Sequence, residues 1–272
     1  HLDLIVNPKS KDVFKMRSSI IFKIRTLLNE KGFMEVETPM LQNLHGGASA
    51  KPFVTHHNAL GQDFYLRIAE ELYLKRLIVG GFEKIYEIGK NFRNEGIDRT
   101  HNPEFTMLEL YESYSDVNDM MVLCEELIKN ISKNLKLKTV KFMGNQINLN
   151  KKFNKISMND LVQKEFGVDV LNMNNHQLYN LCVSHKLDVD KKMNFGQLFD
   201  KLFSTFIEPK LIQPTFVFDY PKSISPLAKV HRKDDKLVER FELFVAGMEF
   251  ANAFSELNDP IDQRKRFEEQ LE

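Results

Sequence analysis

The sequence contains no tryptophan and only two cysteines, Cys124 and Cys182, among its 272 residues. Both cysteines lie in helix-like segments and lack a CxxC spacing, which is typical of reduced thiols in an intracellular protein. A disulfide scaffold or a zinc site is therefore not expected. Apolar runs of about 18 residues, the length that a membrane span needs, are missing, and so is a signal-peptide pattern. These features predict a globular, soluble protein without a membrane segment.

An excess of one charge is also missing, because 38 Lys and Arg residues balance 38 Asp and Glu residues. Without an overall positive field, general binding to nucleic acid is not expected, and any RNA contact must be local or come from a further part of the protein. With 42% apolar residues, the chain can form one large hydrophobic core or two modest ones. It starts at His1 rather than at Met, so we expect a segment of a longer protein.

Hydrophobic periodicity predicts the elements of the first part of the chain. An amphipathic helix is expected over 11–31, a strand over 33–41 that stops near Pro39, a Gly-rich loop over 45–53 and a helix over 69–79. Alternation then predicts a strand over 84–93, followed by a polar loop and a second strand. On this second strand one face carries Phe105, Met107, Glu109 and Tyr111. A hairpin with aromatic and acidic side chains on one face is therefore expected.

The second part of the chain begins with the clearest periodic element, a helix over 116–135. A hairpin turning at Gly144 and Asn145 and three helices near 158–166, 176–184 and 195–208 follow. We therefore expect a helical insertion at about 140–212. A strand over 214–221 and two strands joined at Ala246 and Gly247 then return to the main sheet.

Two pairs of residues suggest binding chemistry. Arg93 and Phe105, across the first hairpin, suit a nucleotide, because a guanidinium binds phosphate and an aromatic ring stacks on a base. Glu242 and Glu249, on the last hairpin, are hard oxygen ligands of the kind that Mg²⁺ prefers. From these residues alone, simpler roles stay open: a surface ion pair for the arginine, core packing for Phe105 and solvated carboxylates on the last hairpin.

Several longer stretches of the sequence resemble one enzyme family. "GFMEVETPML", with Pro39, resembles motif 1 of the class II aminoacyl-tRNA synthetases, and "FRNEGIDRTHNPEFTMLELY", with Arg93, resembles motif 2. "GGASAKPFVTHHN", "RIAEELYLKRLIVGGFEKIYEIG", "SPLAK" and "EFANAFSELNDP" resemble the lysyl-tRNA synthetases within that class. The resemblance covers nearly the whole chain. It implies an α+β catalytic domain over 1–272, with an antiparallel sheet flanked by helices, and a homodimer formed through the motif 1 helix and strand.

The resemblance also implies a role for each matching position. For ATP it implies Arg93 on the α-phosphate, Glu95 on the adenine amino group, His101 and Asn102 on the phosphates and the loop backbone, Phe105 stacked on adenine, and Glu242 and Glu249 as ligands of Mg²⁺. For lysine it implies Gly47 and Glu71 at the α-ammonium, Glu109, Tyr111 and Glu256 at the ε-ammonium, and Asn252 and Arg93 at the carboxylate. Arg93 is the one residue expected to be catalytic, because adenylate formation brings two anions together.

The implied activity is that of a lysine–tRNA ligase, which activates L-lysine with ATP and transfers it to tRNA(Lys) in the cytoplasm or an organelle. A lysine ligase acting on a translation factor is one alternative, although "LYESYSD" resembles the synthetases more. A non-catalytic paralogue that binds lysine or partners is another. Aspartate and asparagine enzymes share motifs 1 and 2, but Glu71, Glu109 and Glu256 would repel an acidic substrate.

Two parts of such an enzyme are missing from the 272 residues. The third class II motif, a Gly-rich strand and helix ending in an arginine, has no match, since no glycine follows Gly247. The N-terminal anticodon-binding barrel has no match either. We therefore expect this stretch by itself to bind ATP poorly.

Overall fold

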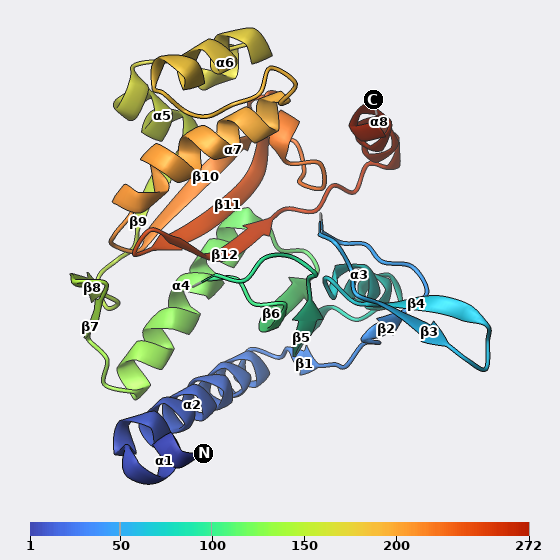
Figure 1. The fold of residues 1–272 in the computed structure, drawn as a ribbon, viewed down its shortest axis with the longest axis vertical. Helices are drawn as coiled ribbons and strands as arrows, with labels where there is room; N and C mark the ends of the chain where they lie inside the picture. Colours follow the sequence, from blue (N-terminus) through green and yellow to red (C-terminus); the bar gives the residue numbers. More distant parts are fainter. Residues whose placement is uncertain (49, 99, 272) are drawn as a thin grey trace. The chain divides into compact units, whose positions relative to one another are not determined.

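A computed structural model describes residues 1–48, 50–98 and 100–271, with the backbone alone at 269–271. The chain divides into two compact units, His1–Tyr114 and Ser115–Glu272 (Figure 1). The first unit contains the motif 1 and motif 2 segments, and the second contains the long helix, the three shorter helices and the last hairpin.

The first unit opens with a short helix, α1 (Leu2–Val6), and a long one, α2 (Pro8–Glu30). α2 begins earlier than the expected 11–31 because Pro8 occupies its first turn and the Asn7 side chain accepts a hydrogen bond from the Lys9 backbone. Of its apolar side chains only Leu28 is buried, while Val13 and Phe14 are 68% and 64% exposed. Most of the apolar face of α2 is therefore not covered within this unit.

A three-stranded sheet in the order β1-β5-β6 forms the centre of the first unit. Its strands are β1 (Met34–Glu35), β5 (Lys84–Phe92) and β6 (Glu104–Glu112), with β1 parallel and β6 antiparallel to β5. The expected strand over 33–41 was too long. β1 ends at Glu35, and after Pro39 the chain enters a second sheet, β2-β4-β3, formed by β2 (Leu41–Gln42), β4 (Gln62–Leu66) and β3 (Val54–His57).

The two faces of the β5–β6 hairpin differ in chemistry. Ile88, Thr106 and Leu108 point to the side where α2 lies, because they line one groove with residues of that helix. The opposite face carries the alternate residues of both strands, including Glu87 and Glu109, and α3 (Glu71–Val79) contacts both strands. The hairpin thus separates an apolar side from an acidic side.

The second unit is built on a four-stranded sheet in the order β12-β11-β10-β9. Its strands are β9 (Asn154–Ser157), β10 (Thr215–Pro221), β11 (Leu237–Val245) and β12 (Met248–Phe254). β9 is parallel to β10, and the other pairs are antiparallel. On one face α4 (Val117–Asn134) packs through Val117 and Met121 against Phe216 and Phe241. α4 begins with a capping box between Asp116 and Asp119.

A larger hydrophobic core lies on the other face of this sheet. Val217 and Phe244 of the strands pack there against Val162, Leu178 and Phe203. These last three belong to α5 (Met158–Phe166), α6 (Asn175–Ser184) and α7 (Phe195–Phe206), and the three helices follow the expected ranges closely.

The remaining elements are short or terminal. They are β7 (Thr139–Phe142), β8 (Asn145–Asn148), the 3₁₀ turns η1 (Val170–Asn172), η2 (Glu208–Lys210) and η3 (Lys222–Ile224), and α8 (Pro260–Leu271). The β7–β8 turn consists of Met143 and Gly144, both with positive φ, one position before the expected Gly144 and Asn145. The observed turn precedes the predicted one because Asn145 is already the first residue of β8.

The α+β class expected from the sequence is confirmed. The helical insertion at 140–212 stays a prediction, although β9 lies inside that range and pairs with β10 of the main sheet. Within the described ranges, a helix with the length and hydrophobicity of a membrane span is not found.

Candidate functional site

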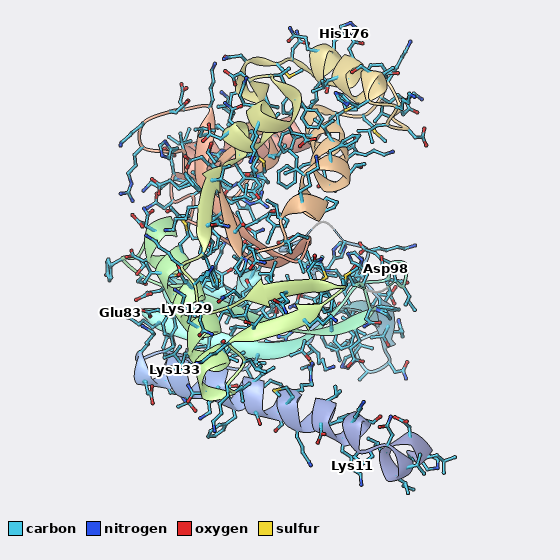
Figure 2. All side chains as sticks on the ribbon, turned by 90° about the vertical axis from the view of Figure 1, so that its left-hand side faces the viewer. Lys11, Glu83, Asp98, Lys129, Lys133 and His176 are labelled. Carbon is cyan, nitrogen blue, oxygen red and sulfur yellow. The ribbon has the colours of Figure 1, made fainter. Side chains whose placement is uncertain are left out.

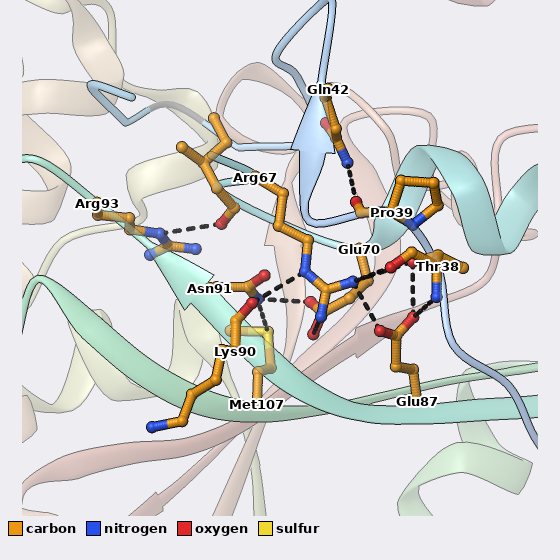
Figure 3. A network of polar contacts seen from close by, with 11 residues as sticks. Thr38, Pro39, Gln42, Arg67, Glu70, Glu87, Lys90, Asn91, Arg93 and Met107 are labelled. Carbon is orange, nitrogen blue, oxygen red and sulfur yellow. Dashed lines mark hydrogen bonds and ion pairs between the residues drawn. The ribbon is translucent and has the colours of Figure 1, made fainter. Parts of the chain in front are cut away.

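Arg93 continues β5 at the loop end of the motif 2 hairpin. Its backbone N–H donates to the carbonyl of Pro103 at 2.9 Å, so the two strands stay paired beyond Phe92. Its side-chain Nε lies 3.4 Å from the carbonyl of Ile68 (Figure 3). Its guanidinium carbon lies 5.1 Å from the centre of the Phe105 ring. The structure thus brings the predicted phosphate ligand and the predicted base-stacking ring together, as a cation–π pair.

The loop between the two strands carries the other predicted ATP residues. Glu95, His101 and Asn102 are all exposed. Among the described contacts, none joins His101 to Arg93. Instead, Nδ1 of His101 lies 2.8 Å from Oδ2 of Asp98 in the same loop (Asp98 is labelled in Figure 2). Hydrogen bonds from the Thr100 backbone and from the His101 side chain hold the pKa of Asp98 well below its usual range. Residue 99 of motif 2 and residue 49 of the Gly-rich loop lie outside the described residues.

Gly47 and Glu71, the two residues predicted at the α-ammonium, are neighbours. Glu71 is the first residue of α3 and only 8% exposed. A Cβ atom at Gly47 would lie 3.2 Å from the Cβ of Glu71, and the φ of Gly47 is +87°, which disfavours other residues. The Glu71 carboxylate accepts from Lys75 Nζ at 2.5 Å. A backbone and a carboxylate thus border the same small space.

Glu109 is the most perturbed acid of the first unit. Tyr111 donates to its Oε1 at 2.7 Å. Burial raises the pKa of Glu109 to about 8; the hydrogen bond from Tyr111 opposes this rise, and the nearby charges of Glu70 and Glu71 add to it. A half-buried acid whose pKa is raised within a cluster of like charges is common in binding sites.

A buried polar network lies beside this acidic cluster (Figure 3). Arg67 is fully buried; its Nη1 donates to Glu87 Oε1 at 2.6 Å, and its Nη2 lies 3.5 Å from Glu70 Oε1. Glu70 is also fully buried, and its Oε2 accepts from Asn91 Nδ2 at 2.5 Å. Glycine is required at position 89, because a Cβ atom there would lie 2.0 Å from Arg67 Nη2.

This network was not predicted from the sequence. The pattern "RIAEE" places Arg67 and Glu70 three positions apart in the segment that precedes α3, close enough in the chain for an ion pair. That signal shows neither burial nor the approach of Glu87 and Asn91 from β5, which only the tertiary structure produces.

The last hairpin, in the second unit, carries Glu242, Glu249 and Asn252 on one face. Glu242 stands opposite Asn252, and Glu249 stands opposite Phe244, with a shift of register between Leu243 and Phe244. An unbroken strand would place positions 249 and 252 on opposite faces. The extra residue of this β-bulge returns both to the face of Glu242.

Glu242 is held by two partners. Its Oε2 accepts from the Tyr220 hydroxyl at 2.8 Å and its Oε1 from Arg240 at 2.5 Å. Arg240 also donates to Oδ1 of Asn252 at 3.1 Å. Burial raises the pKa of Tyr220 well above its usual value, and the charges of Glu242 and Glu249 act in the same direction. Both predicted metal ligands therefore lie close to one phenol.

Two further acids of the second unit bear on this region. Glu256, predicted at the ε-ammonium, forms an isolated bridge with Ala228 of the "SPLAK" stretch. Burial raises the pKa of Glu208 to about 7, and the charges of Glu242 and Asp200 add to the rise. Glu208 was not among the predicted residues. Among the described residues, no three His, Cys, Asp or Glu side chains form a cluster that could hold a metal by themselves.

Comparisons with known proteins agree with this arrangement of motifs. The model of the family "tRNA synthetases class II (D, K and N)" matches residues 1–272. Lysine–tRNA ligase of Halalkalibacterium halodurans is 52% identical over 273 residues, and that of Azobacteroides pseudotrichonymphae is 53% identical over 272 residues. Each alignment covers 100% of this chain and 54% of the relative. The ligase of Roseiflexus sp. is 53% identical, over 99% of this chain and 56% of its own length.

This chain thus spans about half the length of the curated relatives that it matches. The similarity does not extend to the other half of these relatives. It therefore establishes the family of this chain but not the activity of the whole protein. Because the family model matches all 272 residues, the chain belongs to the class II tRNA synthetases of the D, K and N group.

Proposed function

We propose that this chain is the lysine-activating part of a lysine–tRNA ligase, which forms lysyl-adenylate from L-lysine and ATP and transfers lysine to the 3′ end of tRNA(Lys). The observation that carries this proposal is the acidic cluster of Glu70, Glu71 and Glu109 beside Tyr111. A buried cluster of carboxylates disfavours an acidic ligand and favours a cation. Aspartate and asparagine activation fit it poorly, since neither amino acid brings a positive side chain.

Lysine recognition follows from charge-assisted hydrogen bonds. Each bond between an ammonium and a carboxylate in such a pocket is worth roughly 1.5 to 3 kcal/mol. We assign Gly47 and Glu71 to the α-ammonium, and Glu109 and Tyr111 to the ε-ammonium. An uncharged analogue would leave these carboxylates buried and unpaired, so the pocket rejects it without an editing step.

Arg93 and Phe105 are assigned to ATP. In adenylate formation the lysine carboxylate attacks the α-phosphorus, so two anions must approach each other. The guanidinium of Arg93 offsets that repulsion and stabilises the charge of the transition state, and the Phe105 ring stacks on the adenine. We assign Glu95 to the adenine amino group, and His101 and Asn102 to the phosphates and the loop backbone. No side chain needs to act as a general acid or base.

In the second unit we assign Glu242 and Glu249 to Mg²⁺, Asn252 to the lysine carboxylate and Glu256 to the ε-ammonium. The donors fit the metal, because two carboxylates near one phenol provide the hard oxygen ligands that Mg²⁺ takes. Bound Mg²⁺ neutralises phosphate charge. Arg240 occupies one oxygen of Glu242 and holds Asn252. This arginine therefore fixes the orientation of both assigned groups.

Lysine-dependent exchange of pyrophosphate into ATP tests the proposal on the full-length protein. We expect exchange with lysine, and none with aspartate or asparagine. Charging of tRNA(Lys) then separates a tRNA ligase from a ligase that acts on a translation factor. A folded protein without any exchange would instead indicate a paralogue that binds lysine or partners.

We also propose that the protein is a cytoplasmic homodimer. Supporting this, α2 and the outer face of the β5–β6 hairpin line a groove of about 650 Å³, with the apolar residues Val13, Met16, Ile20, Ile21, Ile24, Ile88 and Leu108. Large exposed apolar surface of this kind commonly marks a protein interface. The motif 1 helix of a second copy is the proposed occupant.

Replacing Val13 by aspartate is expected to turn the dimer into a monomer. Val13 is 68% exposed and lines the groove, so a charge there should not disturb the folded chain but would be buried without a partner in the dimer. Light scattering after gel filtration gives the mass directly. Val183→Asp on α6, at a position that is 49% exposed, serves as the control and should remain a dimer. A dimer that survives V13D would rule out this groove as the interface.

A further inference from the structure

Glu70 lies next to the proposed lysine site but has no role in the assignments above. It precedes Glu71 in the chain and is fully buried. One oxygen, Oε2, accepts from Asn91, and the other, Oε1, has no hydrogen-bond donor among the described residues, Arg67 Nη2 being 3.5 Å away. A buried carboxylate oxygen without a donor is costly unless something else supplies a proton or a cation.

The charged groups around Glu70 come from every element packed against it in this unit. Arg67 follows β4, Glu71 and Lys75 belong to α3, Glu87 belongs to β5, and Glu109 and Tyr111 belong to β6. Arg67 pairs with Glu87 at 2.6 Å and, more distantly, with Glu70 at 3.5 Å, and Lys75 pairs with Glu71. These two cations face the four carboxylates of Glu70, Glu71, Glu87 and Glu109, so the charged groups named here carry an excess of negative charge.

Two neighbouring carboxyl groups, one fully buried and one half-buried, cannot both be ionised without a large cost, so one keeps a proton and donates it to the other. Glu109 is the acid that meets this description. Its pKa is raised by burial and, among further causes, by a hydrogen bond with Glu70. A protonated Glu109 supplies the donor that Glu70 lacks.

We propose that Glu70 shares a proton with Glu109 in the unliganded protein and that the site releases this proton when the ammonium group of lysine takes its place. The inference rests on the proposed function, since it names how that site pairs its charge. Glu70 is a positioning residue here, held by Arg67 and Asn91, and acts on the ligand through Glu109. Proton and ammonium compete for the same carboxylates, so the site carries the same net charge with either one.

The direction of the pH dependence follows from this competition. Without lysine, Glu109 keeps its proton up to its pKa of about 8. Lysine must displace that proton at lower pH and keeps its side-chain charge throughout this range. Lysine binding should therefore strengthen as pH rises from 6 to 7.5, by roughly tenfold per pH unit at the lower end.

Isothermal titration of lysine into the full-length protein at pH 6.5, in two buffers of different ionisation enthalpy, counts the protons released. We expect close to one per lysine in the wild type. Glu70→Gln keeps the shape and can donate an amide hydrogen to an ionised Glu109. Burial and the charge of Glu71 still act on Glu109 in this variant, so it should release fewer protons than the wild type, and its lysine affinity should change less steeply with pH.

Glu83→Gln, which removes a charge from an exposed position of the same unit, is the matched control and should behave like the wild type (Figure 2). Lysine binding without proton release would overturn the inference and leave the proposed function standing, and so would equal release by E70Q and the wild type. Absence of lysine binding would overturn the proposed function, and the inference with it. The wild-type proton count needs no variant, so the test holds even if E70Q fails to fold.

Discussion

Replacing Arg93 by alanine is expected to lower lysine-dependent pyrophosphate exchange by roughly 10² to 10³-fold. The guanidinium lies at the end of β5, against the Phe105 ring and near the Ile68 carbonyl, so it is fixed before the substrates arrive. Its charge matters most when the carboxylate and the α-phosphate meet. The loss should therefore appear in kcat more than in the KM for lysine, and steady-state exchange kinetics on the full-length protein measure both.

Two further variants separate charge from geometry. Arg93→Lys keeps the positive charge but loses the planar fork that can bind two oxygens at once, so we expect it to recover only a small part of the rate. Arg264→Ala, on the exposed side of α8, should leave exchange unchanged. An R93A enzyme with full kcat would remove Arg93 from the proposed mechanism.

Replacing Arg67 by methionine is expected to destabilise the protein by about 3–5 kcal/mol. Methionine has a similar length but no charge, so Glu87 and Glu70 would remain buried without their cation. Equilibrium unfolding in urea, followed by circular dichroism, gives the change in free energy of unfolding. Gly89→Ala should act in the same direction, because the new methyl group would lie 2.0 Å from the Arg67 guanidinium and push it away from Glu87.

Arg25 and Glu35 provide a matched control for this prediction. They form an ion pair of similar length in the same unit, at 2.8 Å. Their side chains, however, are 43% and 34% exposed. Because exposed pairs contribute little, Arg25→Met should cost less than about 1 kcal/mol. Equal losses of unfolding free energy in R67M and R25M would show that burial does not determine how much the Arg67 pair contributes to stability.

Much of the fold could be read from local patterns. α3, α4 and the three helices of the second unit lie within a few residues of their predicted ranges, because spacing and caps act over one or two turns. Asp116 with Asp119 and the Gly80–Gly81 pair are signals of this kind. The strand predicted over 33–41 was too long, because its alternation continues past the point where Thr38 bonds to Glu87 and the chain leaves the sheet.

By itself, the sequence determined the family motifs, the α+β class and the residue types that suit ATP, lysine and Mg²⁺, because these depend on identity and spacing along the chain. The tertiary structure decided which of them share an environment. Burial, together with the charges of Glu70 and Glu71, raises the pKa of Glu109. A single bulge returns Glu249 to the face of Glu242. Both effects depend on neighbours distant in sequence and on solvent exposure. Local patterns of residues predict neither of these.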